Sequence, residues 1–333
     1  MIIEDLTLIK SLGKSSFGEV FLSSKNGSSM KYITKVIDKA SVNNTEAKKY
    51  LDNEISFLKD INHPNIVHLI ELKDTEEKLY IVQDYCNGGE LSKFLEKYRE
   101  MNNKGLPEEV VQHIMRQLLS VMEYLSNKKI MHRDLKLDNI FINYEDENDK
   151  KNKNIMKATI KLNDFAFAKY LKKGELTHTT IGSPLYMSPI ILNKLNEDPE
   201  YKNKGYDGKE DIWSLGNICY ELLMGKSAFD SEDMEELHQK INKGDYYFPI
   251  TVSKEIVSFI NGMLQYDSSK RLSFDELKNH KFLKKNVNEF HKIESNKLKN
   301  LSDEDNAQLL LNTKNNKRCW IILEMEPKKI FEE

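Results

Sequence analysis

The stretch that most constrains this chain covers residues 130–143 and reads IMHRDLKLDNIFIN. It places an acid (Asp134), a cation two residues later (Lys136) and a carboxamide (Asn139) between two apolar segments. Apolar residues on both sides predict two short strands that hold the polar loop rigidly between them. The loop is a candidate site, and the alternative is a charged surface loop. A site of this kind requires partner motifs elsewhere in the chain.

The bulk properties limit the class of protein. With 333 residues the chain is long enough for a substantial core, and this length favours roughly two domains. Acids and bases are interspersed and give a formal net charge of -3. Such a balance produces no field that would attract nucleic acid or an acidic membrane surface. We therefore expect no nucleic-acid partner.

The three cysteines, Cys86, Cys219 and Cys319, are far apart and form no CxxC pair or Cys/His cluster. This pattern predicts reduced thiols and disfavours both a disulfide framework and a zinc site. The first residues lack a basic region followed by a long apolar run, and no later segment approaches the roughly 18 apolar residues of a membrane span. We expect a soluble, cytoplasmic protein without a transmembrane segment.

The first part of the chain predicts a sheet and one helix. Three alternating runs within residues 6–38 predict an antiparallel meander, and residues 62–69 and 78–91 predict two more strands. Between them, residues 45–60 predict a helix with Leu51, Ile55 and Leu58 on its buried face.

The remainder predicts mainly helices. They are expected over residues 107–129, 207–223, 231–243 and 253–265, with a capping box at Ser273 and Glu276 before a last helix that ends near Phe282. The charged run 143–157 predicts a solvated loop between two strands. Beyond residue 283, an amphipathic stretch at 302–312 predicts a helix, and the apolar run 319–325 predicts a strand.

Several motifs, in this order, resemble the signature set of protein kinases. They are the loop GKSSFGEV (13–20), the lysine of ITK (33–35), HRD with its asparagine (132–139) and NDFA (163–166). The resemblance covers residues 6–283 and implies an α+β, bilobal kinase fold. Its small antiparallel sheet lobe with one helix would span 1–85 and its larger, mainly helical lobe 86–283. Residues 284–333 would be an extension packed on the kinase body or a regulatory tail.

The resemblance implies a serine/threonine kinase that uses ATP and Mg²⁺ on protein substrates. Asp134 would accept the proton of the substrate hydroxyl, and Lys136 would neutralise charge on the moving phosphoryl group. Asn139 and Asp164 would bind the metal. Lys35 would hold the α- and β-phosphates and pair with Glu54 on the helix, whose neighbours Asp52 and Asn53 do not align with the family.

The same resemblance implies where adenine would bind. The hinge would be Asp84, Tyr85 and Cys86, with Gln83 as the gatekeeper behind it. Apolar walls and the glycine-rich loop would complete the site, through Leu12, Val20, Ile33, Phe141, Gly13 and Gly18. Each of the four apolar residues is equally interpretable as ordinary core, and the glycine loop alone as a tight turn.

Three positions depart from the family pattern. Ser15 replaces a glycine and is expected to stiffen the loop, and Ala166 replaces the glycine of DFG and is expected to reduce flipping of that segment. The glutamate of the APE motif is missing, because Ile190 stands in its place. Its usual partner survives as Arg271, which we expect to find another acceptor or solvent. These departures support an alternative function, a pseudokinase that acts as a nucleotide-gated scaffold.

Further assignments concern regulation and subfamily. Thr179 is the favoured phosphorylation site, with Arg133 and Lys169 as basic receptor, and Asp211 would brace the catalytic loop. Ser183 together with Lys136 is typical of serine/threonine kinases. The phrases DYCNGGEL, LNDFAFAKYL, GSPLYMSP and YDGKEDIWSLG resemble the Unc-51-like kinases that initiate autophagy. That family binds regulatory subunits through a long distal region, and the short tail here counts against those partners.

Overall fold

The computed structural model describes residues 2–15, 17–42, 45–172, 175–179, 181–231, 233–248 and 252–285. The chain forms two compact units. Of the described residues, the first unit contains those up to Phe94 together with Ser120–Tyr170, and the second contains Leu95–Leu119 together with those from Leu171 to Lys285. The helix and strand predicted at 302–312 and 319–325 lie outside the described residues. The predicted lobe boundary at residues 85 and 86 stays a prediction.

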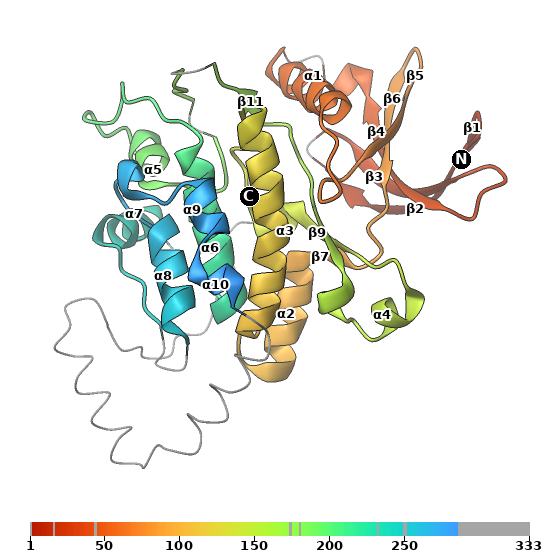
Figure 1. The fold of residues 1–333 in the computed structure, drawn as a ribbon. Coiled ribbons are helices and arrows are strands. Elements are labelled where there is room, and N and C mark those ends of the chain that lie inside the picture. The colour runs from red at the N-terminus through yellow and green to blue at the C-terminus, as the bar shows by residue number, and fades with distance from the viewer. Residues whose placement is uncertain are drawn as a thin grey trace. The chain divides into compact units, whose positions relative to one another are not determined.

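The first unit is built on a six-stranded antiparallel sheet with the order β1-β2-β3-β4-β6-β5 (Figure 1). Its strands are β1 (Ile2–Ile3), β2 (Leu6–Lys14), β3 (Glu19–Lys25), β4 (Lys31–Asp38), β5 (Leu69–Asp74) and β6 (Lys78–Asp84). The alternating runs place apolar side chains on one face, where Leu6, Leu8 and Val82 are buried together. The predicted meander, β2 to β4, is confirmed.

One predicted strand is wrong. Residues 62–68 form no strand, and β5 begins only at Leu69. Pro64 has no N–H to donate to a ladder, and the chain turns here because the Ile66 N–H donates to the His63 carbonyl at 3.0 Å. The Val67 N–H then donates to the Leu162 carbonyl at 2.9 Å. This irregular segment brings Val67 next to the strand that precedes Asp164.

The predicted helix is confirmed as α1 (Thr45–Asp60), which follows the 3-10 helix η1 (Lys39–Val42). Its buried face differs from the prediction at one position. Ile55 is only half-buried, whereas Glu54 is 1% exposed. The helix therefore directs a carboxylate inward, and such a group requires a partner.

The predicted short strands around the polar loop are present. The loop lies between β8 (Ile130–Met131) and β9 (Ile140–Asn143) and contains the 3-10 helix η2 (Leu137–Asn139). A small sheet has the order β10-β9-β7, from β7 (Gly89–Glu90) and β10 (Thr159–Leu162), and β11 (Lys169–Tyr170) pairs with β8.

The charged run between β9 and β10 is largely exposed, as predicted, but it is not only loop. It forms the short helix α4 (Glu147–Lys151) and the 3-10 helix η3 (Ile155–Lys157) (Figure 1). Asp146 caps α4 by accepting hydrogen bonds from the backbone N–H groups of Asn148 and Asp149. Capping by an acid explains why so polar a run becomes helical.

The second unit is mainly helical. Two helices begin or end in it, α2 (Leu91–Asn102) and α3 (Glu108–Asn127). The others are η4 (Pro184–Tyr186), α5 (Pro189–Leu195), α6 (Lys209–Met224), α7 (Met234–Lys243), α8 (Lys254–Met263), η5 (Ser268–Lys270), α9 (Phe274–Lys278) and α10 (Lys281–Lys284). The predicted capping box at Ser273 and Glu276 is confirmed. None of the helices in these described ranges has the length and apolar character that a membrane span requires.

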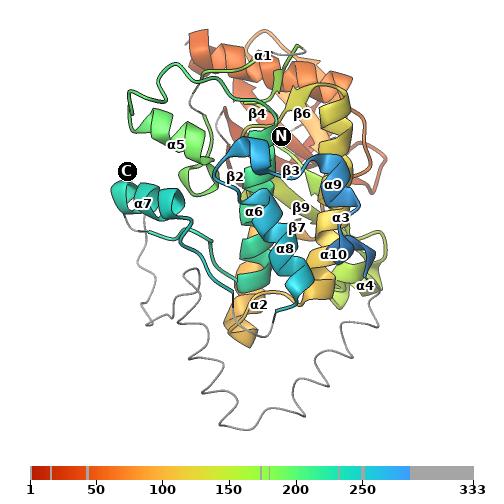
Figure 2. The same cartoon turned by 60° about the vertical axis from the view of Figure 1, so that its left-hand side comes forward.

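Helix α6 is the centre of the second unit and packs against α8 (Figure 2). Its apolar side chains are almost all buried, and the ring of Trp213 stacks on that of Phe229 with centroids 5.5 Å apart. Gly216 permits the close approach of α8, because a Cβ atom there would lie 2.9 Å from side-chain atoms of Met263 and Leu264.

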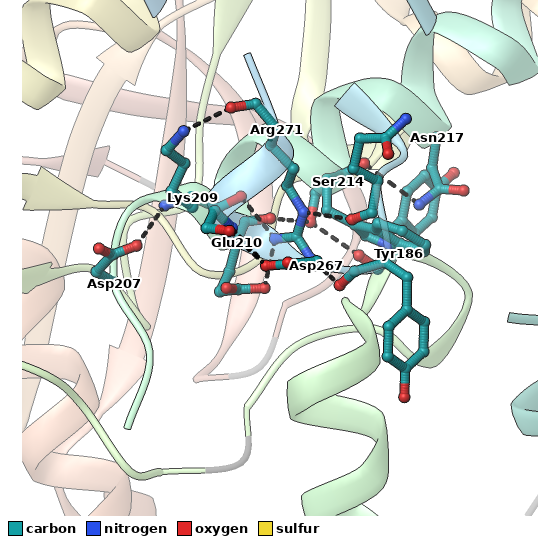
Figure 3. Close-up of polar contacts among 12 residues, drawn as sticks. Tyr186, Asp207, Lys209, Glu210, Ser214, Asn217, Asp267 and Arg271 are labelled. Carbon is teal, nitrogen blue, oxygen red and sulfur yellow. Dashed lines mark hydrogen bonds and ion pairs between the residues drawn. The ribbon is translucent and has the colours of Figure 1, made fainter. Parts of the chain in front are cut away.

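Arg271 finds a new acceptor on α6, as predicted. Its Nη1 donates to Oε2 of Glu210 at 2.8 Å and to the Lys209 carbonyl at 2.9 Å (Figure 3). Its Nε donates to the Gln265 carbonyl at 2.9 Å, and its guanidinium carbon lies 5.2 Å from the ring of Trp213. A glutamate on α6 thus supplies the carboxylate that Ile190 cannot provide.

Candidate active site

The first unit contains a cavity of about 490 Å³, which is within the usual range for a small-molecule site. Every residue that lines it belongs to this unit. These residues come from β2, β3, β4, β6, β7, β9, η2, the first turn of α2, the segment before β5 and the residues just after β2, β6 and β10. The lining residues are Leu12, Gly13, Lys14, Ser15, Val20, Ile33, Lys35, Val67, Gln83, Asp84, Tyr85, Cys86, Gly89, Glu90, Lys93, Asn139, Phe141, Asn163 and Asp164.

The predicted pairing of Lys35 with Glu54 is present. Lys35 Nζ lies 2.5 Å from Glu54 Oε1, and the lysine is only 9% exposed. Burial by itself would lower the pKa of Lys35, but the negative charges of Glu54 and Asp164 outweigh it, so the pKa is raised above the usual 10.5. The cavity therefore contains a permanent, positioned cation that can bind phosphate.

Asp134 is held in place from several directions. It is 5% exposed, and its backbone N–H donates to Nδ1 of His132 at 3.3 Å. Nδ2 of Asn139 donates to its carbonyl oxygen at 2.9 Å and to its Oδ2 at 3.2 Å. The ring of His132, in turn, packs edge-on against Phe165, with centroids 4.9 Å apart. Asp134 itself does not line the cavity, but it contacts Asn139, which does.

Lys136 neutralises Asp134 in this structure. Its Nζ lies 3.1 Å from Asp134 Oδ2, and its side chain is partly exposed. A flexible ammonium group beside the acid can reach a transferred phosphoryl group without leaving the loop. The pair thus combines a proton acceptor with a mobile cation.

The donor set at the cavity fits a magnesium ion. The Asn139 side-chain nitrogen is engaged by Asp134, which leaves the amide oxygen for a cation, and the Asp164 carboxylate lies in the same cavity. Mg²⁺ prefers oxygen ligands and is usually bound by one or two protein groups plus phosphates and water. The described residues contain no cluster of three or more His, Cys, Asp or Glu that could hold a metal ion. Asp164 adopts a φ of 64°.

The glycine-rich loop differs in part from the prediction. Gly13 lines the cavity with a φ of 136°, a conformation that favours glycine. Gly18 does not line it, and its small size is needed for another reason, because a Cβ atom there would lie 2.1 Å from the Val36 carbonyl oxygen. The Ser15 N–H and hydroxyl both donate to the Gly18 carbonyl, at 2.7 and 3.0 Å, and stiffening of the loop by Ser15 stays a prediction.

The predicted apolar walls and hinge residues lie at this cavity, and their binding of adenine stays a prediction. Leu12, Val20, Ile33 and Phe141 all line the cavity, as do the hinge residues. Asp84 Oδ2 pairs with Lys161 Nζ at 2.8 Å and accepts a hydrogen bond from the His68 N–H at 3.2 Å. Two residues that do not line the cavity therefore hold the Asp84 side chain of the hinge in place. Burial raises the pKa of the Cys86 thiol to about 12, which leaves it unreactive.

The back of the cavity is polar. Gln83 Nε2 donates to Asn163 Oδ1 at 3.4 Å, while the buried Gln83 Oε1 has no hydrogen-bond partner among the described residues. Val67, Asn163 and Lys93 also line the cavity and were missed by the sequence analysis. Asn163 lies in the NDFA motif directly before Asp164, and that position could have identified it. The positions of Val67 and Lys93 depend on turns and long-range contacts for which the sequence carries no signal.

Together the lining residues combine apolar walls with a buried cation and two oxygen donors, and an acid with an adjacent lysine lies beside them. The chemistry of this arrangement fits a nucleoside phosphate and a divalent cation. The chain belongs to the protein kinase domain family, whose model matches residues 6–283.

Three relatives of this chain have nearly the same sequence identity to it. Serine/threonine-protein kinase atg1 of Dictyostelium discoideum is 31% identical over 87% of this chain and 41% of its own length. Serine/threonine-protein kinase ATG1a of Arabidopsis thaliana is 32% identical over 85% and 42%. CBL-interacting serine/threonine-protein kinase 18 of Arabidopsis thaliana is 32% identical over 83% and 49%. The chain thus spans less than half the length of these curated relatives.

Proposed function

We propose that this protein is an active serine/threonine protein kinase that transfers the γ-phosphate of ATP to protein hydroxyl groups. The observation that carries the proposal is the buried 2.5 Å pair of Lys35 and Glu54, whose lysine lines the same cavity as Asn139 and Asp164. The relatives' names, each a serine/threonine-protein kinase, support the reaction and the type of acceptor.

Each residue has a distinct role in the proposed reaction. Lys35, oriented by Glu54, binds the phosphates, while Asn139 and Asp164 hold Mg²⁺. When bound, Mg²⁺ neutralises phosphate charge. Asp134 orients the substrate hydroxyl and accepts its proton. Because the transition state of phosphoryl transfer is loose, positioning and electrostatics supply most of the catalysis.

The substitution Asp134→Asn separates the kinase from the pseudokinase scaffold. Loss of a positioned base lowers the rate by about 10²- to 10⁴-fold, and nucleotide binding should persist because Asp134 does not line the cavity. Transfer from labelled ATP to a basic substrate protein measures turnover, and calorimetry measures binding.

The control for this experiment is Asp138→Asn, which changes an exposed acid of η2, four residues after Asp134 in the same loop. It should leave turnover unchanged. If wild-type protein binds nucleotide but transfers no label under the same conditions, the scaffold is the correct function.

We further propose Thr179 as a regulatory phosphorylation site. Its side chain is exposed, whereas Thr177 is 3% exposed and pairs through its backbone with Tyr206. Mass spectrometry after incubation with Mg²⁺ and ATP should find phosphate on Thr179 and not on Thr177. Phosphate on Thr177 instead would contradict the assignment.

A finer proposal is a cytoplasmic role in autophagy initiation, with protein substrates of that process. It is supported by the motif phrases shared with Unc-51-like kinases and by the relatives named atg1 and ATG1a. The protein should restore autophagy in Dictyostelium discoideum cells that lack their atg1 kinase, and the Asp134→Asn variant should not. Equal restoration by both proteins would exclude a catalytic role.

A further inference from the structure

The backbone that follows Asp164 is bound at three consecutive carbonyl groups. The Asn53 side-chain nitrogen donates to the carbonyls of Ala166, at 3.0 Å, and Ala168, at 2.7 Å. The carbonyl between them, of Phe167, accepts from Nε of Arg133 at 2.6 Å. An amide nitrogen has two N–H donors, so both donors of Asn53 are used on this segment.

One side of α1 follows this segment for most of its length. Tyr50, Asn53, Phe57 and Asp60 are spaced by three, four and three residues, so they share one face of the helix. The Tyr50 ring packs edge-on against Phe167 at 5.1 Å, and Phe57 stacks on Tyr170 at 4.6 Å. The Tyr170 hydroxyl donates to Asp60 Oδ2 at 2.6 Å.

Glu54 follows Asn53 directly and points toward Lys35. A rotation of α1 that withdraws Glu54 would therefore break both hydrogen bonds of Asn53. Conversely, displacement of the backbone after Asp164 would release the helix. Among these contacts, the side-chain amide of Asn53 connects α1, at the position next to Glu54, to the backbone directly after Asp164.

We propose that Asn53 is a positioning residue that couples α1 to the Asp164 segment, so that phosphate binding by Lys35 and metal binding by Asp164 occur together. The proposal rests on the proposed function only for its consequence in catalysis. The coupling itself is a property of the folded chain and of its binding of magnesium with a nucleotide.

The test uses the isosteric substitution Asn53→Asp, which replaces both donors by an oxygen that repels the two carbonyls. A matched variant, Asp52→Asn, changes the exposed neighbour, and the double variant Asp52→Asn/Asn53→Asp preserves composition and net charge. Calorimetry with a non-hydrolysable ATP analogue, in Mg²⁺ and in EDTA, measures how much magnesium strengthens binding.

Loss of two hydrogen bonds should reduce the gain from magnesium by about ten-fold in Asn53→Asp and in the double variant. Asp52→Asn should match wild type. A residue with a merely structural role would lower the melting temperature or weaken binding equally in Mg²⁺ and EDTA. An unchanged magnesium gain in a folded Asn53→Asp protein overturns the coupling.

A second measurement does not depend on nucleotide. Hydrogen exchange of the Ala168 N–H, which donates to the Phe165 carbonyl at 3.0 Å, and of β11 should quicken in Asn53→Ala. Alanine has the higher helix propensity, so α1 itself is not weakened by this change. Unchanged hydrogen exchange in Asn53→Ala overturns the coupling, whether or not the wild-type protein transfers phosphate. If the wild-type protein transfers no phosphate but exchange is faster in Asn53→Ala, only the proposed function is overturned.

Discussion

The buried pair of Glu210 and Arg271 permits a quantitative prediction for the substitution Glu210→Gln. Arg271 is 2% exposed and Glu210 is 4% exposed, so neither group is solvated by water. Breaking a buried pair from one side costs about 3–5 kcal/mol. The carbonyls of Lys209 and Gln265 remain as acceptors for Arg271, and glutamine keeps a polar contact. We therefore expect the lower end, about 3 kcal/mol.

That loss lowers the equilibrium constant for folding by about 100-fold. With a urea slope of roughly 3 kcal/mol/M, the unfolding midpoint should fall by about 1 M. Urea unfolding followed by circular dichroism measures the shift. The control is Asp207→Asn, which changes an exposed acid in the preceding turn whose side chain accepts from the Lys209 N–H (Figure 3). Asparagine also accepts that bond, so its midpoint should stay near wild type.

A double substitution tests the physical cause. Replacing both partners by apolar residues of similar volume, Glu210→Leu with Arg271→Met, removes the unpaired charge and should recover most of the lost stability. The reasoning is refuted if Glu210→Gln unfolds at the wild-type midpoint. It is also refuted if the double variant is less stable than Glu210→Gln, because removal of the charge would then bring no benefit.

Three further predictions concern the first unit. Ser15→Gly removes the hydrogen bond of the Ser15 hydroxyl within the glycine-rich loop and should weaken nucleotide binding by about two- to five-fold, measured by calorimetry. Unchanged affinity would contradict the expected stiffening of this loop by Ser15. Ala166→Gly frees the backbone of a buried residue and should lower the free energy of unfolding by about 0.4–1 kcal/mol in a urea titration, and an increase would contradict this. Burial lowers the pKa of His63 below its usual 6.5, so the stability that its neutral form contributes is lost as pH falls below about 6.5. His63→Gln should therefore reduce the loss of stability between about pH 7.5 and about pH 5.5, and an equal loss would exclude His63.

The sequence predicted those features that depend on local pattern. Lys35 lies on a strand that the apolar pattern predicted, and Asn139 and Asp164 each lie at a fixed spacing within a short motif. That the three residues line one cavity was implied by the resemblance of these motifs, in their order, to the kinase set. The pairing of Glu54 with Lys35, which the resemblance implied, is present, although the prediction that Ile55 is buried was wrong.

Features that depend on contacts far apart in the sequence were not predictable. Asn53 was set aside as a neighbour of Glu54, yet its partners, Ala166 and Ala168, lie more than a hundred residues away. Arg271 was expected to find some acceptor, but nothing in the sequence identified Glu210. In both cases a side chain binds groups whose positions are determined by packing and not by a repeating pattern.

The central claim is that the cavity of the first unit binds Mg²⁺ with ATP and transfers phosphate. Its most direct test is the transfer of label from γ-phosphate-labelled ATP to a basic substrate protein, compared between wild type and Asp164→Asn. The account predicts magnesium-dependent transfer to serine or threonine by wild type, and a loss of that transfer when the Asp164 carboxylate is removed. Equal transfer by both proteins, or transfer by wild type in excess EDTA, would contradict it.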